Sequence, residues 1–145
     1  MAPLKSPRSI AAAILLACGI ALAQEQTTSS VLDGVYTEAQ ASHGAQAYAQ
    51  SCAPCHGASL GGVGEAPALV GGGFISDIAG LTLGDLFDRM RTTMPLNNPG
   101  GLSREQYSDI LAFVLKSNGF PSGPRELYQR SEYLNVIRFE APKTP

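Results

Sequence analysis

The spacing of hydrophobic positions predicts two amphipathic helices. The first spans residues 38–51, has Thr37 as its N-cap, and places apolar or small residues at helical intervals, namely Ala41, Ala45, Tyr48 and Ala49. The second follows Ser103, whose spacing to Gln106 is that of a capping box, and Gly119 ends it. The apolar positions of the second helix are Tyr107, Ile110, Leu111, Phe113, Val114 and Leu115.

A third helix is predicted between these two. It starts at Thr82 or Gly84 and runs to Arg91, and Pro95 cannot continue it. The glycine-rich stretch 57–73 predicts a loop. No alternating pattern is strong enough to build a sheet, so the predicted fold class is all-α.

The last part of the chain, residues 121–145, predicts little regular structure. Pro124 suits the first position of a short helix, and residues 133–139 look extended. We therefore treat this part as a tail on a helical domain.

The N-terminal residues read as a secretory signal peptide. Lys5 and Arg8 are basic, residues 10–20 are almost wholly apolar, and Ala21 and Ala23 supply the small residues before a cleavage site. The apolar run is too short to span a bilayer as a helix. We expect residues 1–23 to be removed and the protein to be periplasmic.

Cys18 allows a second interpretation of this segment. Residues 15–18, Leu-Leu-Ala-Cys, faintly resemble a lipoprotein box, in which Cys18 would become a lipidated first residue. The apolar core before it is short and Leu16 fits the box poorly, so we favour removal of Cys18 with the signal peptide.

The most specific motif is Cys52-Ala53-Pro54-Cys55-His56. C-x-x-C-H is the attachment motif of c-type haem. Two thiols three residues apart can straddle one porphyrin edge and form thioethers, and the adjacent His56 then becomes the proximal ligand of the iron. The sequence thus predicts one covalently attached haem c, held by Cys52, Cys55 and His56.

Two other uses of the motif are a zinc knuckle and a thioredoxin-like C-x-x-C. Zinc needs four ligands, and the only other histidine, His43, lies on the wrong side of the motif with no further thiol nearby. A redox C-x-x-C would need a strand before it, and none is predicted. The haem interpretation is therefore preferred.

These elements together resemble the class I, cytochrome c-like monohaem cytochromes. The resemblance runs through residues 39–57, AQASHGAQAYAQSCAPCHG, and through residues 109–116, DILAFVLK. It implies a few helices packed around one haem, with the first helix crossing the last. At that crossing it implies that Gly44 and Tyr48 meet Ile110 and Phe113, which accounts for a glycine inside the first helix.

The resemblance also implies the remaining haem contacts. The family uses a Met sulfur as distal ligand, and Met94, which precedes Pro95 after a helix, has the matching setting. Met90 lies one turn earlier and reads better as a core residue, and His43 is a remote third choice. A proline carbonyl after the motif holds the axial His, and Pro67 has that place. Arg89 and Arg91 either pair with a haem propionate or are solvated.

The net charge of the chain restricts the kinds of partner that it can bind. The sequence has 12 acidic against 10 basic residues, and two of the basic ones leave with the signal peptide. An acidic surface argues against nucleic acid and favours a redox partner with a basic docking patch. Such partners are a dehydrogenase as electron donor or an oxidase as acceptor.

A narrower resemblance concerns residues 92–103 and 118–127. Both resemble haem domains and small cytochrome subunits associated with bacterial periplasmic quinoprotein alcohol dehydrogenases. The expected organisation is a signal peptide (1–23), an N-terminal extension (24–36), a cytochrome c domain (37–120) and a C-terminal tail (121–145).

The expected function is electron transfer, without a catalytic set in the chain itself. The alternatives are a haem-containing structural subunit of a dehydrogenase complex and a haem enzyme or sensor with an open sixth position.

Overall fold

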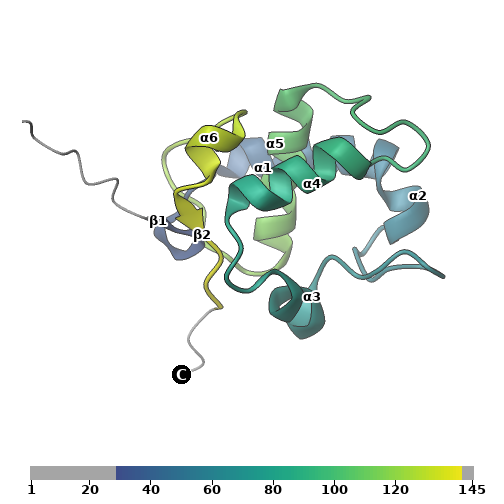
Figure 1. The fold of residues 1–145 in the computed structure, drawn as a ribbon, viewed down its shortest axis with the longest axis horizontal. Coiled ribbons are helices and arrows are strands. Elements are labelled where there is room, and N and C mark those ends of the chain that lie inside the picture. The colour runs from purple at the N-terminus through teal and green to yellow at the C-terminus, as the bar shows by residue number, and fades with distance from the viewer. Residues whose placement is uncertain (1–28, 142–145) are drawn as a thin grey trace, which may run out of the picture.

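A computed structural model of the chain describes residues 29–141. The predicted signal peptide and Cys18 lie outside these residues. Three longer helices carry the fold: α1 (Glu38–Ser51), α4 (Leu83–Thr93) and α5 (Arg104–Ser117). The shorter elements are β1 (Ser29–Ser30), the 3-10 turn η1 (Val31–Asp33), α2 (Ala53–His56), α3 (Gly71–Ile78), α6 (Ser131–Leu134) and β2 (Ile137–Arg138) (Figure 1). The predicted all-α fold class is confirmed.

Helices α1 and α5 begin at the predicted caps, and α4 begins after Thr82, one of its two predicted starts. The Thr37 hydroxyl accepts a hydrogen bond from the Gln40 amide, which satisfies one free donor of the first turn of α1. Complete capping boxes start the other two helices, Thr82 with Asp85 on α4 and Ser103 with Gln106 on α5. Local sequence therefore fixes where these helices start.

Helices α1 and α5 make the most extensive helix–helix contact among the described residues. Gly44 is buried in this contact, and the ring of Tyr48 packs on Phe113 with centroids 5.3 Å apart. The backbone of Ile110 also lies beside Gly44. The predicted crossing at Gly44, Tyr48, Ile110 and Phe113 is confirmed.

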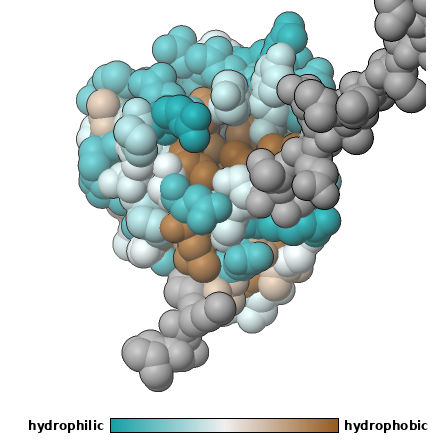
Figure 2. Space-filling view, turned by 90° about the vertical axis from the view of Figure 1, so that its left-hand side faces the viewer, coloured by the Kyte–Doolittle hydropathy of each residue, from teal (hydrophilic) through white to brown (hydrophobic). Residues whose placement is uncertain are grey.

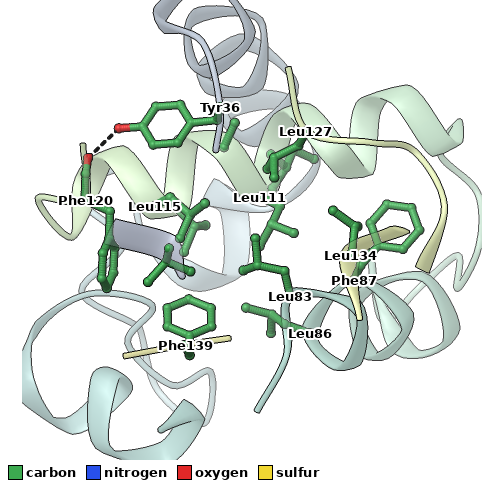
Figure 3. Packing of buried hydrophobic residues seen from close by; sticks show 14 of the residues in the cluster. Tyr36, Leu83, Leu86, Phe87, Leu111, Leu115, Phe120, Leu127, Leu134 and Phe139 are labelled. Carbon is green, nitrogen blue, oxygen red and sulfur yellow. Dashed lines mark hydrogen bonds between the residues drawn. The ribbon is translucent and has the colours of Figure 1, made fainter. Parts of the chain in front are cut away.

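The hydrophobic core lies between α5, α4 and the C-terminal tail, as Figure 3 shows. Leu111 and Leu115 of α5 face Leu83 of α4, and Leu134 closes the layer from the tail. All four side chains are fully buried. The tail therefore packs on one side of α4 and α5 and stabilises their arrangement.

The two ends of the described chain are joined. Strands β1 and β2 pair in parallel, with Ser29 opposite Ile137. The Tyr36 hydroxyl donates to the Phe120 carbonyl (2.6 Å), and the Gln40 side chain accepts from the Leu127 amide (2.8 Å). The tail thus wraps the helical domain. The face where β1, α6 and β2 lie shows hydrophobic residues at its centre within a hydrophilic surround (Figure 2).

Three local expectations are wrong. Helix α3 starts at Gly71, inside the stretch predicted to be a loop, because Phe74 and Ile78 bury one face of it in the core. The short helix of the tail forms at 131–134 and not at Pro124, and residues 133–139 are extended only at β2. The tail takes its shape from packing, which leaves little local signal.

Candidate haem-binding site

The C-x-x-C-H motif forms one helical turn directly after α1. Cys52 ends α1, where its amide donates to the Tyr48 carbonyl (2.8 Å), and also starts α2. The amide of His56 donates back to the Cys52 carbonyl (2.9 Å). This turn brings Cys52, Cys55 and His56 together as the sequence predicts.

Both thiols of the turn are free, Cys52 partly buried and Cys55 exposed. Burial, with a smaller contribution from the charge of Cys55, raises the pKa of the Cys52 thiol to about 11. A redox-active C-x-x-C typically has a lowered thiol pKa, and the shift of Cys52 is in the opposite direction. No group of three His, Cys, Asp or Glu side chains within residues 29–141 is arranged to hold a metal ion.

His56 is held in one orientation. Its side chain is only 8% exposed, and its Nδ1 atom lies 2.9 Å from the Pro67 carbonyl oxygen. A carbonyl can only accept, so Nδ1 carries the proton and Nε2 keeps a lone pair for a metal. The contact that the resemblance implied for Pro67 is present, and it is the type of contact that fixes the ring of a metal-ligating histidine.

The loop after His56 is tied back at several points. The Gly62 amide donates to the His56 carbonyl (2.9 Å), and the Leu69 amide donates to the Leu60 carbonyl (2.7 Å). The Tyr48 hydroxyl donates to the Gly57 carbonyl (2.8 Å). Burial raises the pKa of Tyr48 to about 12, so this hydroxyl keeps its proton at neutral pH. The Pro67 carbonyl is thereby held at the His56 ring.

Met94 lies at the other candidate position. It caps the C-terminus of α4, is partly exposed, and donates its amide to the Met90 carbonyl (2.9 Å). Met90 packs against the hydrophobic core, whereas Met94 is outside the residues of that core. In Figure 1, the loop after α4 and helix α2 lie at the same end of the long axis of the molecule.

The other candidates have different surroundings. His43 is exposed on α1, nine residues before Cys52 and therefore about 13 Å away along the helix. Arg91 pairs with Asp88 (3.2 Å) and lies over the Phe87 ring, 5.7 Å from its centroid. Arg89 is exposed. Arg91 is thus already engaged within α4.

These residues fit a haem. Two free thiols and a histidine with one committed nitrogen supply the three attachment points of a c-type haem in one turn. Three apolar side chains near the loop after His56 and the loop after Met94 are only partly buried, namely Leu69, Val70 and Met90. Partly buried apolar side chains suit contact with an apolar macrocycle.

The sequence did not predict which side chains bind the loop after Met94 and the loop after His56. The Tyr107 hydroxyl donates to the Met94 carbonyl (2.7 Å), and the Asn118 amide group donates to the Leu69 carbonyl (2.9 Å). The signal was present, since a tyrosine on the buried face of a helix needs a partner for its hydroxyl. The identity of that partner depends on the fold.

An all-α fold with a C-x-x-C-H turn after its first helix defines a class I c-type cytochrome. The family described as cytochrome C oxidase, cbb3-type, subunit III matches residues 39–114, and the chain belongs to this family. A cytochrome c domain binds haem and transfers electrons. A comparison with curated proteins finds no match.

A solved structure supports the fold. The crystal structure of the sulfane dehydrogenase SoxCD from Paracoccus pantotrophus is similar over 77% of this chain and 60% of that chain, with 22% sequence identity and a TM-score of 0.51. At this identity the similarity concerns the fold alone. This chain spans about 60% of the length of that one. Within residues 29–141, no helix has both the length and the apolar character needed to cross a membrane.

Proposed function

We propose that this protein is a periplasmic electron-transfer cytochrome c that carries one covalently attached haem. The observation that carries the proposal is the hydrogen bond from His56 to Pro67 beside two free thiols in one helical turn. In this proposal residues 37–120 form the cytochrome domain. Residues 1–23 are a cleaved signal peptide, and residues 24–36 and 121–145 extend the domain.

The residues have separate roles in this proposal. Haem, when bound, supplies an iron that cycles between Fe(III) and Fe(II). Cys52 and Cys55 anchor the macrocycle through thioethers, and His56, made more basic by the Pro67 carbonyl, is the proximal ligand. Met94 is the distal ligand, and its soft, neutral thioether favours the ferrous state and raises the reduction potential.

The partners are redox proteins, with a dehydrogenase as donor and an oxidase as acceptor. One observation favours a dehydrogenase. Residues 92–103 and 118–127 resemble cytochromes associated with quinoprotein alcohol dehydrogenases. A haem-bearing subunit of such a dehydrogenase complex is the second candidate function, and it would copurify with a larger catalytic subunit.

Covalent attachment tests the proposal. The protein isolated from periplasm should keep its haem after denaturation and acid–acetone extraction, and its pyridine haemochrome should be of the c type. Cys52→Ala or Cys55→Ala should leave at most one thioether and shift that spectrum. Cys18→Ala is the matched control and should leave both thioethers. Haem that extracts cleanly from the unaltered protein would refute the proposal.

Localisation has its own measurement. The mass of the periplasmic protein should correspond to a chain that starts at Gln24 and carries one haem. A lipid-modified N-terminus at Cys18 would refute cleavage before Gln24, and a protein found only in the cytoplasm would refute export.

A further inference from the structure

The Tyr107 hydroxyl donates a hydrogen bond to the backbone carbonyl of Met94, with 2.7 Å between the two oxygens. Tyr107 belongs to α5, and Met94 ends α4. The tyrosine side chain is 2% exposed and its ring packs edge-on against Phe87, with centroids 6.5 Å apart. The hydroxyl is therefore presented to Met94 from a rigid and buried position.

This bond is the main polar attachment of the loop that follows Met94. The other hydrogen bonds of residues 95–101 in the described structure are local, from the Asn98 amide to Pro95 and from the Gly101 amide to Asn98. The Gly100 amide also approaches the Met94 carbonyl, at a longer 3.4 Å. Leu96 in this loop is 79% exposed, so packing holds the loop only weakly.

We propose that Tyr107 is a positioning residue that holds the Met94 sulfur at its ligand position by anchoring the Met94 carbonyl to α5. The inference rests on the proposed function, in which Met94 is the distal ligand. When the Met94 sulfur leaves that position by a movement of the loop backbone away from α5, the Tyr107 hydrogen bond is lost. The free energy of this bond then adds to the strength of ligation.

Tyr36 offers a matched control at another loop. Tyr36 is also buried, and its hydroxyl also donates to a loop carbonyl, that of Phe120, at 2.6 Å. Tyr36→Phe removes the same kind of hydrogen bond from a loop that carries no candidate ligand. It separates a general loss of stability from an effect on Met94.

The experiment measures how well imidazole displaces Met94 in the full-length ferric protein. Tyr107→Phe keeps the ring against Phe87 and removes only the hydroxyl. A lost hydrogen bond of ordinary strength should let imidazole bind about 2- to 10-fold more tightly than it binds the unaltered protein. The near-infrared charge-transfer band of Met-ligated ferric haem should weaken or disappear at lower imidazole concentration. Tyr36→Phe should leave imidazole affinity unchanged.

The outcomes distinguish this inference from the proposed function. If the band is present and all three proteins bind imidazole equally, Tyr107 has no positioning role although Met94 is the ligand. An equal gain in both variants would also refute the role, since it would reflect stability alone. A band missing from the unaltered protein would refute Met94 as ligand and this inference with it, while covalent haem and electron transfer would stand.

A second measurement needs no variant. In the unaltered ferric protein the Tyr107 hydroxyl proton should exchange slowly with solvent, as observed by NMR. It should exchange faster once saturating imidazole has replaced Met94. An exchange rate that does not change would overturn the proposal even if Tyr107→Phe did not accumulate.

Discussion

The Cα atom of Gly44 lies directly against the backbone carbonyl of Asp109, so that a Cβ atom at position 44 would overlap the carbonyl oxygen. The obstacle is backbone and not the end of a flexible side chain. Helices α1 and α5 can therefore approach this closely only with glycine at position 44. Because α1 runs directly into the C-x-x-C-H turn, this contact also sets where the turn lies relative to α5.

Gly44→Ala should destabilise the protein, although alanine is the better helix former. Overpacking typically costs about 1–3 kcal/mol, and a cost near the upper end is expected because the Cβ would overlap backbone atoms of Asp109. That cost exceeds the roughly 1 kcal/mol that alanine gains over glycine in a helix. Gly73→Ala is the control, because Gly73 lies within α3 and a Cβ there meets nothing within 4 Å. It should leave the protein as stable or more stable. Denaturant unfolding of both holoproteins measures the difference, and a stable Gly44→Ala protein would contradict the close crossing.

The two methionines of α4 should behave differently. Met94→Ala should abolish the near-infrared band of the ferric protein, lower the reduction potential and allow CO to bind the ferrous form. Met90→Ala should keep the band. It should lower the free energy of unfolding by less than the roughly 2–5 kcal/mol that truncation of a fully buried methionine costs, since Met90 is only partly buried. The reverse pattern would assign the ligand role to Met90. A band absent from the unaltered protein would return His43 to consideration.

The hydrogen bond of His56 should tune the reduction potential. Gly62 has φ +77°, and a Cβ there would lie 2.6 Å from the Ala66 carbonyl oxygen, 2.8 Å from the Ala68 nitrogen and 2.9 Å from the Pro67 carbonyl carbon. Gly62→Ala should therefore push the Pro67 carbonyl from His56, make the imidazole a weaker donor and raise the potential. Its stability should fall by about 1–3 kcal/mol through backbone strain.

Gly64→Ala is the control for that measurement. Gly64 lies in the same loop and has φ +58°, but a Cβ there would meet nothing within 4 Å. It should lose stability through strain and keep the potential of the unaltered protein. Voltammetry of the two variants gives the comparison, and equal shifts in both would contradict a role for the His56–Pro67 bond.

Reaction with the redox partner should slow as salt rises. The chain is acidic, and salt screens the attraction to a basic partner over about 10 Å at 0.1 M. Residues 57–66 contain one charged residue, Glu65, and residues 92–103 contain none. The effect should therefore come from the overall field, and Glu65→Gln should change the rate little. Stopped-flow reduction by candidate dehydrogenases across ionic strength measures it, and a rate that is flat or rises with salt would contradict the steering.

The sequence by itself determined the features that are local in the chain. The caps at Thr37 and Ser103 predicted the starts of α1 and α5, because a capping side chain binds an amide only two or three residues away. The start of α4 was predicted at Thr82 or Gly84, and Thr82 caps it. The C-x-x-C-H spacing predicted that both thiols and His56 serve one haem, and these residues are also close together in the chain. The resemblance to class I cytochromes added the contacts of Gly44 and Pro67.

Only the tertiary structure decided which distant groups meet. The tyrosine hydroxyls of positions 36, 48 and 107 donate to the carbonyls of Phe120, Gly57 and Met94, and the sequence around each tyrosine does not specify its partner. Helix α3 and the tail also form against local preference, because burying Phe74, Ile78 and Leu134 outweighs poor helix propensity and missing caps. Side chains with a local partner leave a pattern in the sequence, whereas those stabilised across the fold do not.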